Sequence, residues 1–289
     1  MSPVQDAAVQ RRRLRGELRR AREAAGRTQK DAALAMDWSL SKLTRIESGR
    51  VGISTNDLRA LLHHYGVNDA AEVDRFIKMA RTSKTERAWW TGYREAISPQ
   101  FLSFLSYENS ASAIYHFEPM VVPGLLQEEE YARAVLQALS GSATSKRVEE
   151  LVELRMKRQE ELLYRQDPPE MLFIMDEAAL HRWIGGRDVM RHQLLHLREI
   201  AAEQSKVTIE VVPFTAGAHP GMKGPFVILE FADDVDEDVL FLEDFRGDVI
   251  SRDEREEIDP AREALGSLRD LARKENIESA IDRTLKEMS

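Results

Sequence analysis

The side chains whose type and spacing first suggest chemistry are two histidines in the second half of the chain. His192 and His196 stand four residues apart, a spacing that places both imidazoles on one face of a helix and can clamp a metal ion. Gln193 follows His192, where metalloproteases with this spacing carry a glutamate. We therefore interpret the pair as the polar edge of a helix and predict no metal site.

Two other polar stretches could hold an ion. His219 stands in the glycine-rich stretch TAGAHPGMKG, which lacks the glycine spacings of phosphate-binding and dinucleotide-binding loops, so we expect a loop between strands. An acidic run offers oxygen ligands for calcium but lacks the central glycine and the distal glutamate of a calcium hand, so we expect a solvated turn. The run consists of Asp233, Asp234, Asp236, Glu237 and Asp238.

The chain lacks two common signatures of nucleophilic catalysis. It contains no cysteine, which excludes disulfides, zinc–thiolate sites and cysteine nucleophiles. No serine stands in the glycine-flanked motif of a nucleophile elbow. We predict no catalytic residue, no cofactor and no metal, and therefore a function other than catalysis.

Basic side chains are concentrated in the first quarter of the chain. The first 68 residues hold 13 Lys+Arg and 7 Asp+Glu, a net charge of +6, whereas the remainder holds 28 and 43, a net charge of −15. The large anion that we expect such a basic head to bind is nucleic acid. Chance clustering of solvated charge is the alternative at this point.

The hydrophobic spacing of this basic segment predicts five short helices. Leu14, Leu18, Ala21 and Ala25 fall on one helical face, and Gly26 ends that helix. Thr28 caps the next helix, with Asp31 three residues later. The expected helices are Leu14–Ala25, Gln29–Met36, Leu40–Ser48, one that follows Ser54 and Thr55 and is closed by Gly66, and Asp69–Thr82. Two short helices joined by a tight break inside such a bundle indicate a helix-turn-helix arrangement.

The stretch REAAGRTQKDAALAMDWSLSKLTRIESG, residues 22–49, resembles the Xre and phage-repressor class of helix-turn-helix domains. The matching residues are Arg22, Thr28, Gln29, Ala32, Ala33, Ile46, Glu47 and Gly49. The resemblance implies that Arg22 and Glu47 form an internal ion pair between the first and third helices. It departs from the class at Asp37, where a glycine is usual, although aspartate tolerates left-handed backbone. For Trp38 beside it we favour packing against the bundle over stacking on a sugar–phosphate edge.

The resemblance also implies which residues contact DNA. The third helix would enter the major groove, with Arg45 bonded to guanine, Leu40 against a thymine methyl, and Ser41 and Thr44 able to serve either base. Gln29 would meet a phosphate through its side chain and backbone N–H. The complete set of expected DNA contacts is Gln29, Ser39, Leu40, Ser41, Lys42, Thr44, Arg45 and Arg50, with Lys42 and Arg50 on phosphates. A possible DNA arm consists of Arg11, Arg12, Arg13 and Arg15, a run that suits the start of a helix poorly.

Three segments are expected: a DNA-binding domain over residues 1–82, an aromatic connector over 83–100 with Trp89, Trp90 and Tyr93, and a larger domain over 101–289. The connector aromatics suit packing better than a ligand cage. The expected helices of the larger domain are Leu102–Phe117, Gln127–Leu139, Thr144–Tyr164, Asp176–Ile184, Asp188–Gln204 and Ala261–Met288. The expected strands are Met171–Met175, Val207–Val212, Phe226–Phe231 and Val239–Leu242. The predicted fold class is mainly α, with a five-helix head and an α+β body.

The body resembles the C-terminal domain of actinobacterial WhiJ-like regulators. The resemblance rests on the segments FEPMVVPGLLQEEEYARAVL, RMKRQEELL, DEAALHRWIGGRDVMRHQLLHL and VPFTAGAHPGMKGPFVILEF. It implies an antitoxin-like regulator of transcription, often encoded beside a gene for a small acidic partner protein.

Three functions remain open. The first is a sequence-specific DNA-binding regulator that binds a palindromic operator in double-stranded DNA as a homodimer, its body dimerising or receiving a small acidic partner protein. The second is a one-component sensor whose body binds a small-molecule effector, and the third is a DNA-tethered enzyme. No apolar run reaches the roughly 20 residues of a membrane helix, and the N-terminus lacks the apolar core of a signal peptide. We therefore expect a cytoplasmic, nucleoid-associated protein.

Overall fold

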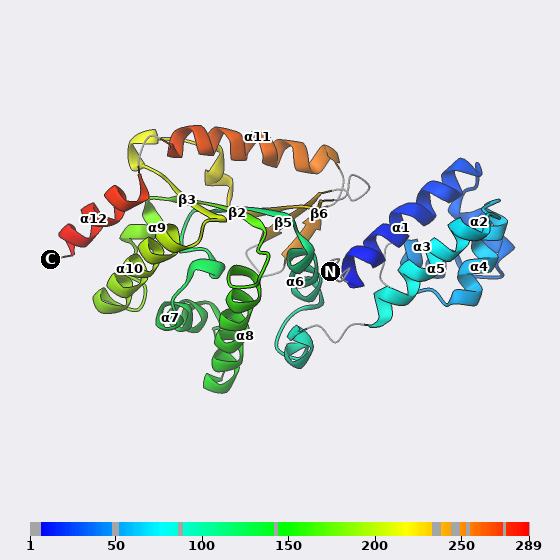
Figure 1. The fold of residues 1–289 in the computed structure, drawn as a ribbon, viewed down its shortest axis with the longest axis horizontal. Helices are drawn as coiled ribbons and strands as arrows, with labels where there is room; N and C mark the ends of the chain where they lie inside the picture. The colour runs from blue at the N-terminus through cyan, green and yellow to red at the C-terminus, as the bar shows by residue number, and fades with distance from the viewer. Residues whose placement is uncertain are drawn as a thin grey trace. The chain divides into compact units, whose positions relative to one another are not determined.

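The computed structural model describes residues 7–47, 52–85, 89–141, 144–232, 238–243, 249–252, 255–273 and 276–288. The chain forms two compact units, Met1–Trp89 and Trp90–Ser289 (Figure 1). The first unit is helical, and the second combines helices with a sheet. A helix-turn-helix head followed by an α+β body is therefore confirmed as the fold class.

The first unit consists of short helices separated by capped turns. Thr28 caps α2 through a reciprocal pair of hydrogen bonds with Asp31, and Ser54 caps α4 by accepting the Asp57 N–H. The helices are α1 (Ala7–Ala24), α2 (Gln29–Ala35), α3 (Leu40–Glu47), α4 (Thr55–His64) and α5 (Ala70–Thr85). The apolar faces of these helices meet in one core, in which Leu18, Leu43, Leu58 and Phe76 are fully buried. One face of α3 packs against this core, and the opposite face of the helix is exposed.

The second unit is built on a six-stranded sheet of the order β3-β2-β1-β4-β5-β6 among the described residues. The strands are β1 (Ala113–Glu118), β2 (Glu170–Asp176), β3 (Val207–Val212), β4 (Phe226–Glu230), β5 (Val239–Glu243) and β6 (Val249–Arg252). β1, β2 and β3 are parallel, whereas β4, β5 and β6 join in antiparallel pairs. The parallel half requires helical crossovers, which place helices against the sheet.

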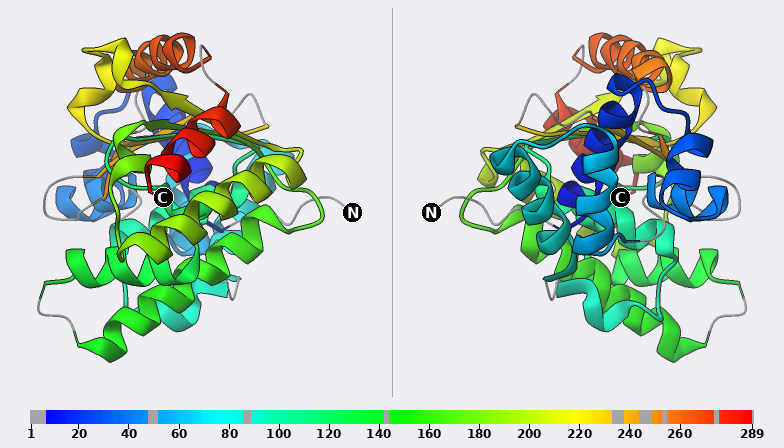
Figure 2. Two further views of the ribbon diagram at one scale, coloured as in Figure 1. Left: turned by 90° about the vertical axis from the view of Figure 1, so that its left-hand side faces the viewer. Right: turned by 90° about the vertical axis from the view of Figure 1, so that its right-hand side faces the viewer.

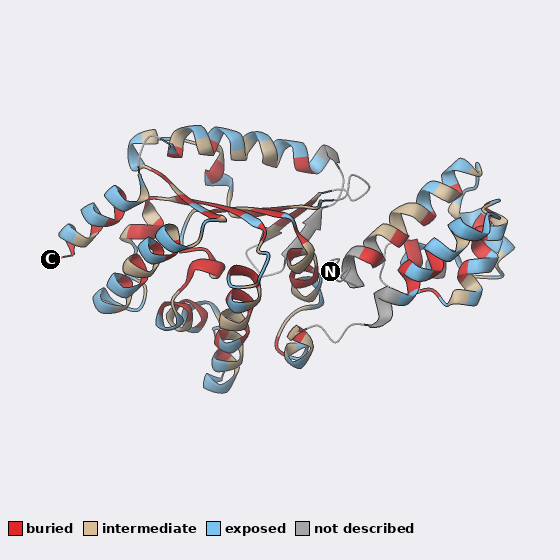
Figure 3. Ribbon diagram, in the orientation of Figure 1, coloured by how far each residue is buried: buried red, intermediate tan, exposed pale blue. Residues whose placement is uncertain are grey.

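Helices cover both faces of this sheet (Figure 1, Figure 2). They are α6 (Pro99–Ser110), α7 (Glu129–Leu139), α8 (Ser145–Leu163), α9 (Ala178–His181), α10 (Arg187–Glu203), α11 (Arg255–Ala272) and α12 (Ile277–Glu287). The long helix α11 packs on one face through Ile258 and Leu268, whereas α7, α8 and α10 lie on the other (Figure 1). Figure 3 shows the sheet as the most continuously buried layer of the unit. The unit therefore has a three-layer architecture around one buried sheet.

Alternation along the strands divides the sheet residues between the two faces. Phe117 of β1 and Leu240 of β5 belong to the cluster under α11. Their neighbours His116 and Phe241 point to the opposite face, where Phe241 packs edge-on against Phe104 of α6. By the same period of two, Glu118 and Glu243 at the ends of their strands belong to the α8 side.

Three of the predicted helices of the second unit differ from the structure. Of the expected helix Asp176–Ile184 only Ala178–His181 is helical, because Asp176 is the last residue of β2. Residues 102–117 form the end of α6 and then β1, because β1 is sandwiched between β2 and β4 and receives hydrogen bonds from both. Residues 261–288 form two helices, and α12 starts at its own cap, where Asn276 accepts the Glu278 N–H. β6, Val249–Arg252, was not predicted at all and exists by pairing with β5.

Glu177 provides a pH-dependent tie between three parts of the second unit. Its carboxylate, 6% exposed, accepts the Phe214 N–H at 2.6 Å and the Arg283 guanidinium of α12 at 2.5 Å. Burial acts to raise the pKa of Glu177, but these two donors outweigh it and the pKa is lowered. The carboxylate therefore contributes stability above the ordinary glutamate pKa of about 4.3 and loses it as the pH falls through the folded value.

We expect Glu177→Gln to reduce the dependence of unfolding free energy on pH between about pH 6 and pH 3. The wild-type protein should be clearly more stable than the variant at the upper pH, and the gap should narrow as the pH falls. Urea unfolding followed by circular dichroism at each pH measures this difference. Glu203→Gln, at an exposed site at the end of α10, is the control. A gap that stays constant across the pH range would contradict the assignment.

Candidate nucleic-acid interface

The turn between α2 and α3 depends on an aspartate in the left-handed conformation. Asp37 has φ = 54°, the only positive φ among the non-glycine residues that the structure describes. Aspartate adopts this conformation more readily than most residues, so it replaces glycine here. Trp38 follows it and packs, partly buried, against the core of the first unit. The Lys42 ammonium lies over the Trp38 ring, 3.9 Å from its centre, which ties the turn to the first exposed turn of α3.

A buried ion pair joins α1 to α3. Arg22 donates from Nε to Glu47 Oε1 at 2.8 Å and from Nη2 to Oε2 at 3.2 Å, while the two residues are only 8% and 7% exposed. Arg22 also donates to the Arg27 carbonyl at 2.9 Å, beyond the end of α1. The hydrogen bond to Glu47 raises the pKa of Arg22. A bidentate pair of this kind fixes both the distance and the orientation of the two helices.

Gln29 extends this pair into a network between α2 and α3. Its side-chain N–H donates to Glu47 Oε2 at 2.8 Å, and its carbonyl oxygen accepts the Thr44 hydroxyl at 3.3 Å. The sequence did not predict that Gln29 would bridge Glu47 and Thr44. It marked Gln29 only as part of the Thr28-Gln29 pair that resembles the Xre class. The Gln29 side chain that we expected on a phosphate is therefore bonded inside the domain, and it holds α3 against α2.

The outward face of α3 carries most of the expected DNA contacts. Ser39, Leu40, Ser41, Thr44 and Arg45 are exposed, and Leu40 keeps 49% of its surface open to solvent. Leu43 and Ile46, on the inner face, are buried. Arg45 donates from Nε to the Ser41 carbonyl at 3.3 Å, and the Thr44 hydroxyl shares its single proton between Gln29 and the Leu40 carbonyl, which lies 3.0 Å away. Side chains of the types that read base edges thus stand on one face of a rigidly held helix.

Lys42 lies beside this face and is partly covered. Its ammonium contacts Trp38 and stands 3.7 Å from the Asp57 carboxylate at the start of α4. The other phosphate ligand expected from the sequence, Arg50, lies outside the described residues. A phosphate contact by Lys42 would therefore compete with an intramolecular partner, which is exposed and weak.

The arginine run lies within the first helix instead of preceding it. α1 begins at Ala7, so Arg11, Arg12, Arg13 and Arg15 are helical. The side chains of Arg11 and Arg12 are outside the described part of the chain, whereas Arg13 and Arg15 are half-buried. The helix starts seven residues before the expected Leu14, so these arginines belong to a helix and do not form an extended segment.

Among the residues that the structure describes, the ionisable side chains singled out in the body do not assemble into a metal centre. His192 is exposed, and burial lowers the pKa of the half-buried His196, whose Nδ1 is 4.0 Å from Glu199. His219 Nε2 lies 3.0 Å from the Asp176 carboxylate, in the loop between β3 and β4. Within the described ranges, no group of three or more histidines and carboxylates could hold a metal ion. Asp238 is described, but residues 233–237 of the acidic run lie outside those ranges.

Comparison with known families separates the two units. Residues 13–76 match a model described as a helix-turn-helix domain, and residues 101–279 match a domain of unknown function, DUF5753. No curated protein and no solved structure matches the chain. Among the described helices, none is long and apolar enough to cross a membrane. The helix-turn-helix match covers the network and the recognition face described above.

Proposed function

This chain belongs to the family that carries the domain of unknown function DUF5753, and on that premise we propose that it is a sequence-specific DNA-binding regulator of transcription. The single observation that carries the proposal is the exposed face of α3 formed by Leu40, Ser41, Thr44 and Arg45. The Arg22–Glu47–Gln29 network supports it, since a recognition helix must be held rigidly to discriminate base pairs.

The proposal assigns the second unit a regulatory role without catalysis. In the antitoxin-like, WhiJ-like arrangement that the sequence resembles, this unit dimerises the protein or receives a small acidic partner. Two heads would then bind the halves of a palindromic operator about one helical turn apart, and the protein would work on the nucleoid in the cytoplasm. Large apolar side chains exposed on the second unit are the candidates for such a docking surface. They are Met120, Leu139, Tyr164, Trp183, Phe214 and Met222.

The charge of the second unit limits how such a partner can dock. Residues 90–289 hold 23 Lys+Arg and 39 Asp+Glu, a net charge of −16, so an acidic protein is repelled at long range and must meet an apolar or locally basic surface. The same negative charge repels the DNA backbone, so we expect the second unit to face away from the DNA. A one-component sensor is the second candidate function, favoured by the cavity described in the next subsection.

We expect Arg45→Ala to weaken specific DNA binding by about 1–3 kcal/mol and to relax the preference at one base pair. The reason is the loss of a guanidinium that can donate twice to guanine. Fluorescence anisotropy with the DNA upstream of the protein's own gene, at fixed salt and with excess non-specific competitor, measures the change. Arg59→Ala, which removes an exposed arginine from α4, is the matched control.

Lys42→Ala in the same assay separates base reading from phosphate binding. We expect it to weaken all sequences about equally and to lower the salt dependence of binding. If Arg45→Ala leaves specific affinity unchanged while the wild type binds specifically, the recognition face has been placed wrongly. If the wild-type protein does not bind this DNA even at the lowest concentration of non-specific competitor, the proposed function itself fails.

A further inference from the structure

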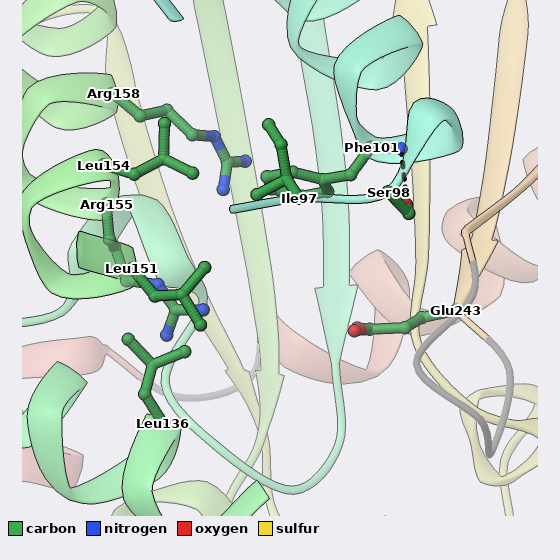
Figure 4. A pocket seen from close by; sticks show the side chains of 9 residues that line it. All are labelled: Ile97, Ser98, Phe101, Leu136, Leu151, Leu154, Arg155, Arg158 and Glu243. Atoms are coloured by element: carbon green, nitrogen blue, oxygen red, sulfur yellow. Dashed lines mark hydrogen bonds between the residues drawn. The ribbon is translucent and has the colours of Figure 1, made fainter. Parts of the chain in front are cut away.

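A cavity of about 230 Å³ opens between α6, α7, α8 and the end of β5. Five of its lining residues are apolar, Ile97, Phe101, Leu136, Leu151 and Leu154, and the others are Ser98, Arg155, Arg158 and Glu243. In Figure 4, Arg155 from α8 and Glu243 from β5 face each other across this space, and Arg158 lies on the α8 side with Arg155. All of these residues belong to the second unit, so the cavity lies within one compact body.

The side chain of Arg155 hydrogen-bonds to a neutral residue, Gln127, and forms no ion pair among the described residues. Its Nη1 donates to the Gln127 side-chain oxygen at 2.6 Å, and no described carboxylate lies within ion-pair distance of its guanidinium. The neighbouring Arg158 differs, because Glu108 neutralises it through two hydrogen bonds of 2.6 and 2.5 Å. Burial, followed by repulsion from Arg158, lowers the pKa of Arg155 to about 10. A guanidinium with unused donors at an apolar cavity is suited to an anionic group.

Both guanidinium groups approach the backbone at Gly124. A side chain there would begin 3.4 Å from Arg158 Nη1 and 3.7 Å from Arg155 Nε. These are ordinary van der Waals distances, so both guanidinium groups lie against the backbone at this point. The hydrogen bond to Gln127 then orients Arg155 without a charged partner in the described part of the chain.

Glu243 supplies the opposite charge at the other wall. It is exposed at the end of β5, and no basic side chain in the described ranges lies within ion-pair distance of its carboxylate. Partial desolvation, followed by repulsion from Glu118, raises the pKa of Glu243. The carboxylate and the Arg155 guanidinium line one cavity without pairing with each other, which leaves each charge incompletely compensated.

We propose that this cavity binds a small zwitterion with an apolar body, of the class of free hydrophobic α-amino acids. The ligand's carboxylate would accept hydrogen bonds from Arg155, its ammonium would face Glu243, and its side chain would lie among Leu136, Leu151 and Leu154. The volume is below the roughly 300–1,000 Å³ of pockets for drug-sized ligands, which agrees with a small metabolite. One ligand of this kind compensates both charges and covers the apolar wall.

Isothermal titration of the full-length protein tests the proposal without DNA, so it is independent of the proposed regulatory function. The probes are L-leucine, L-valine, L-methionine and L-phenylalanine, each at up to about 5 mM. For an amino acid that binds, two analogues separate the charges: the amine without the carboxylate and the acid without the ammonium. We expect both analogues to bind at least about tenfold more weakly than the zwitterion, since each lacks one charge-assisted contact.

Two substitutions test the assigned side chains. We expect Arg155→Gln and Glu243→Gln each to weaken binding about tenfold or more, whereas Arg147→Gln and Glu153→Gln, at other positions of α8, leave it unchanged. Glu243 is exposed, so Glu243→Gln keeps the fold and remains informative if Arg155→Gln unfolds. Circular dichroism verifies folding. Absence of saturable binding for all four amino acids, or binding that neither substitution changes, would overturn the proposal.

Discussion

Arg22→Met is expected to lower the unfolding free energy of the first unit by about 3–5 kcal/mol and to abolish specific DNA binding with it. The substitution leaves the Glu47 carboxylate buried, with Gln29 as its remaining side-chain donor among the described residues. A buried charge without its counter-charge is far more costly than the loss of the pair itself. Because Glu47 is the last residue of α3, the loss falls directly on the recognition helix.

Hydrogen exchange across a urea series, read on peptides from α1 to α5, measures this loss in the first unit alone. Arg19→Met is the matched control, because Arg19 pairs with Glu23 on the surface of the same helix at 62% and 52% exposure. We expect the control to change stability by less than about 1 kcal/mol. The double variant Arg22→Met/Glu47→Met should be more stable than Arg22→Met, since it leaves no buried charge. Equal stability of the Arg22 and Arg19 variants would refute the role of the pair.

Glu108→Gln is expected to destabilise the second unit by a similar amount, about 3–5 kcal/mol. Glu108 is 1% exposed and accepts both hydrogen bonds of the Arg158 guanidinium, which is itself 7% exposed and packs 5.1 Å from the centre of the Phe104 ring. Glutamine keeps the shape of the side chain but removes its charge. Arg158 would then be a buried cation next to Arg155, whose charge is already incompletely compensated.

Urea unfolding followed by circular dichroism, with exchange read on peptides from α6 and α8, measures the effect. Glu149→Gln is the control, because Glu149 pairs with Arg133 on the surface, where both partners remain accessible to water. Glu108→Leu combined with Arg158→Met should recover part of the stability lost in Glu108→Gln. A stability of Glu108→Gln equal to that of the control would mean that the buried pair contributes nothing to the fold.

The cavity and the outward face of α3 differ in how far apart their residues lie in the sequence. The face of α3 depends on side chains close together in the sequence, which the helical period places on one side. The cavity combines Phe101 of α6, Arg155 of α8 and Glu243 of β5, which come from three distant segments. No spacing rule connects these residues, so the sequence offered no sign of the site.

Local sequence alone determined most of the helices and which side chains of α3 face outward. Thr28 and Ser54 cap helices whose apolar residues repeat at the helical period, and Asp37 tolerates the left-handed turn between α2 and α3. Each of these signals involves residues only a few positions apart, so it can be identified from the sequence without the tertiary structure. The charge asymmetry between the two units is likewise a property of composition.

Only the tertiary structure decided which segments of the body became strands and which charges met. Residues 113–117 suit a helix or a strand, and they form β1 because β2 and β4, supplied by segments more than fifty residues later, bind both of its edges. Glu108 pairs with Arg158 across fifty residues, and Gln29 donates to Glu47 across eighteen residues. Pairings of this kind are set by burial and by hydrogen-bond partners that the fold brings together, which is why local patterns did not contain them.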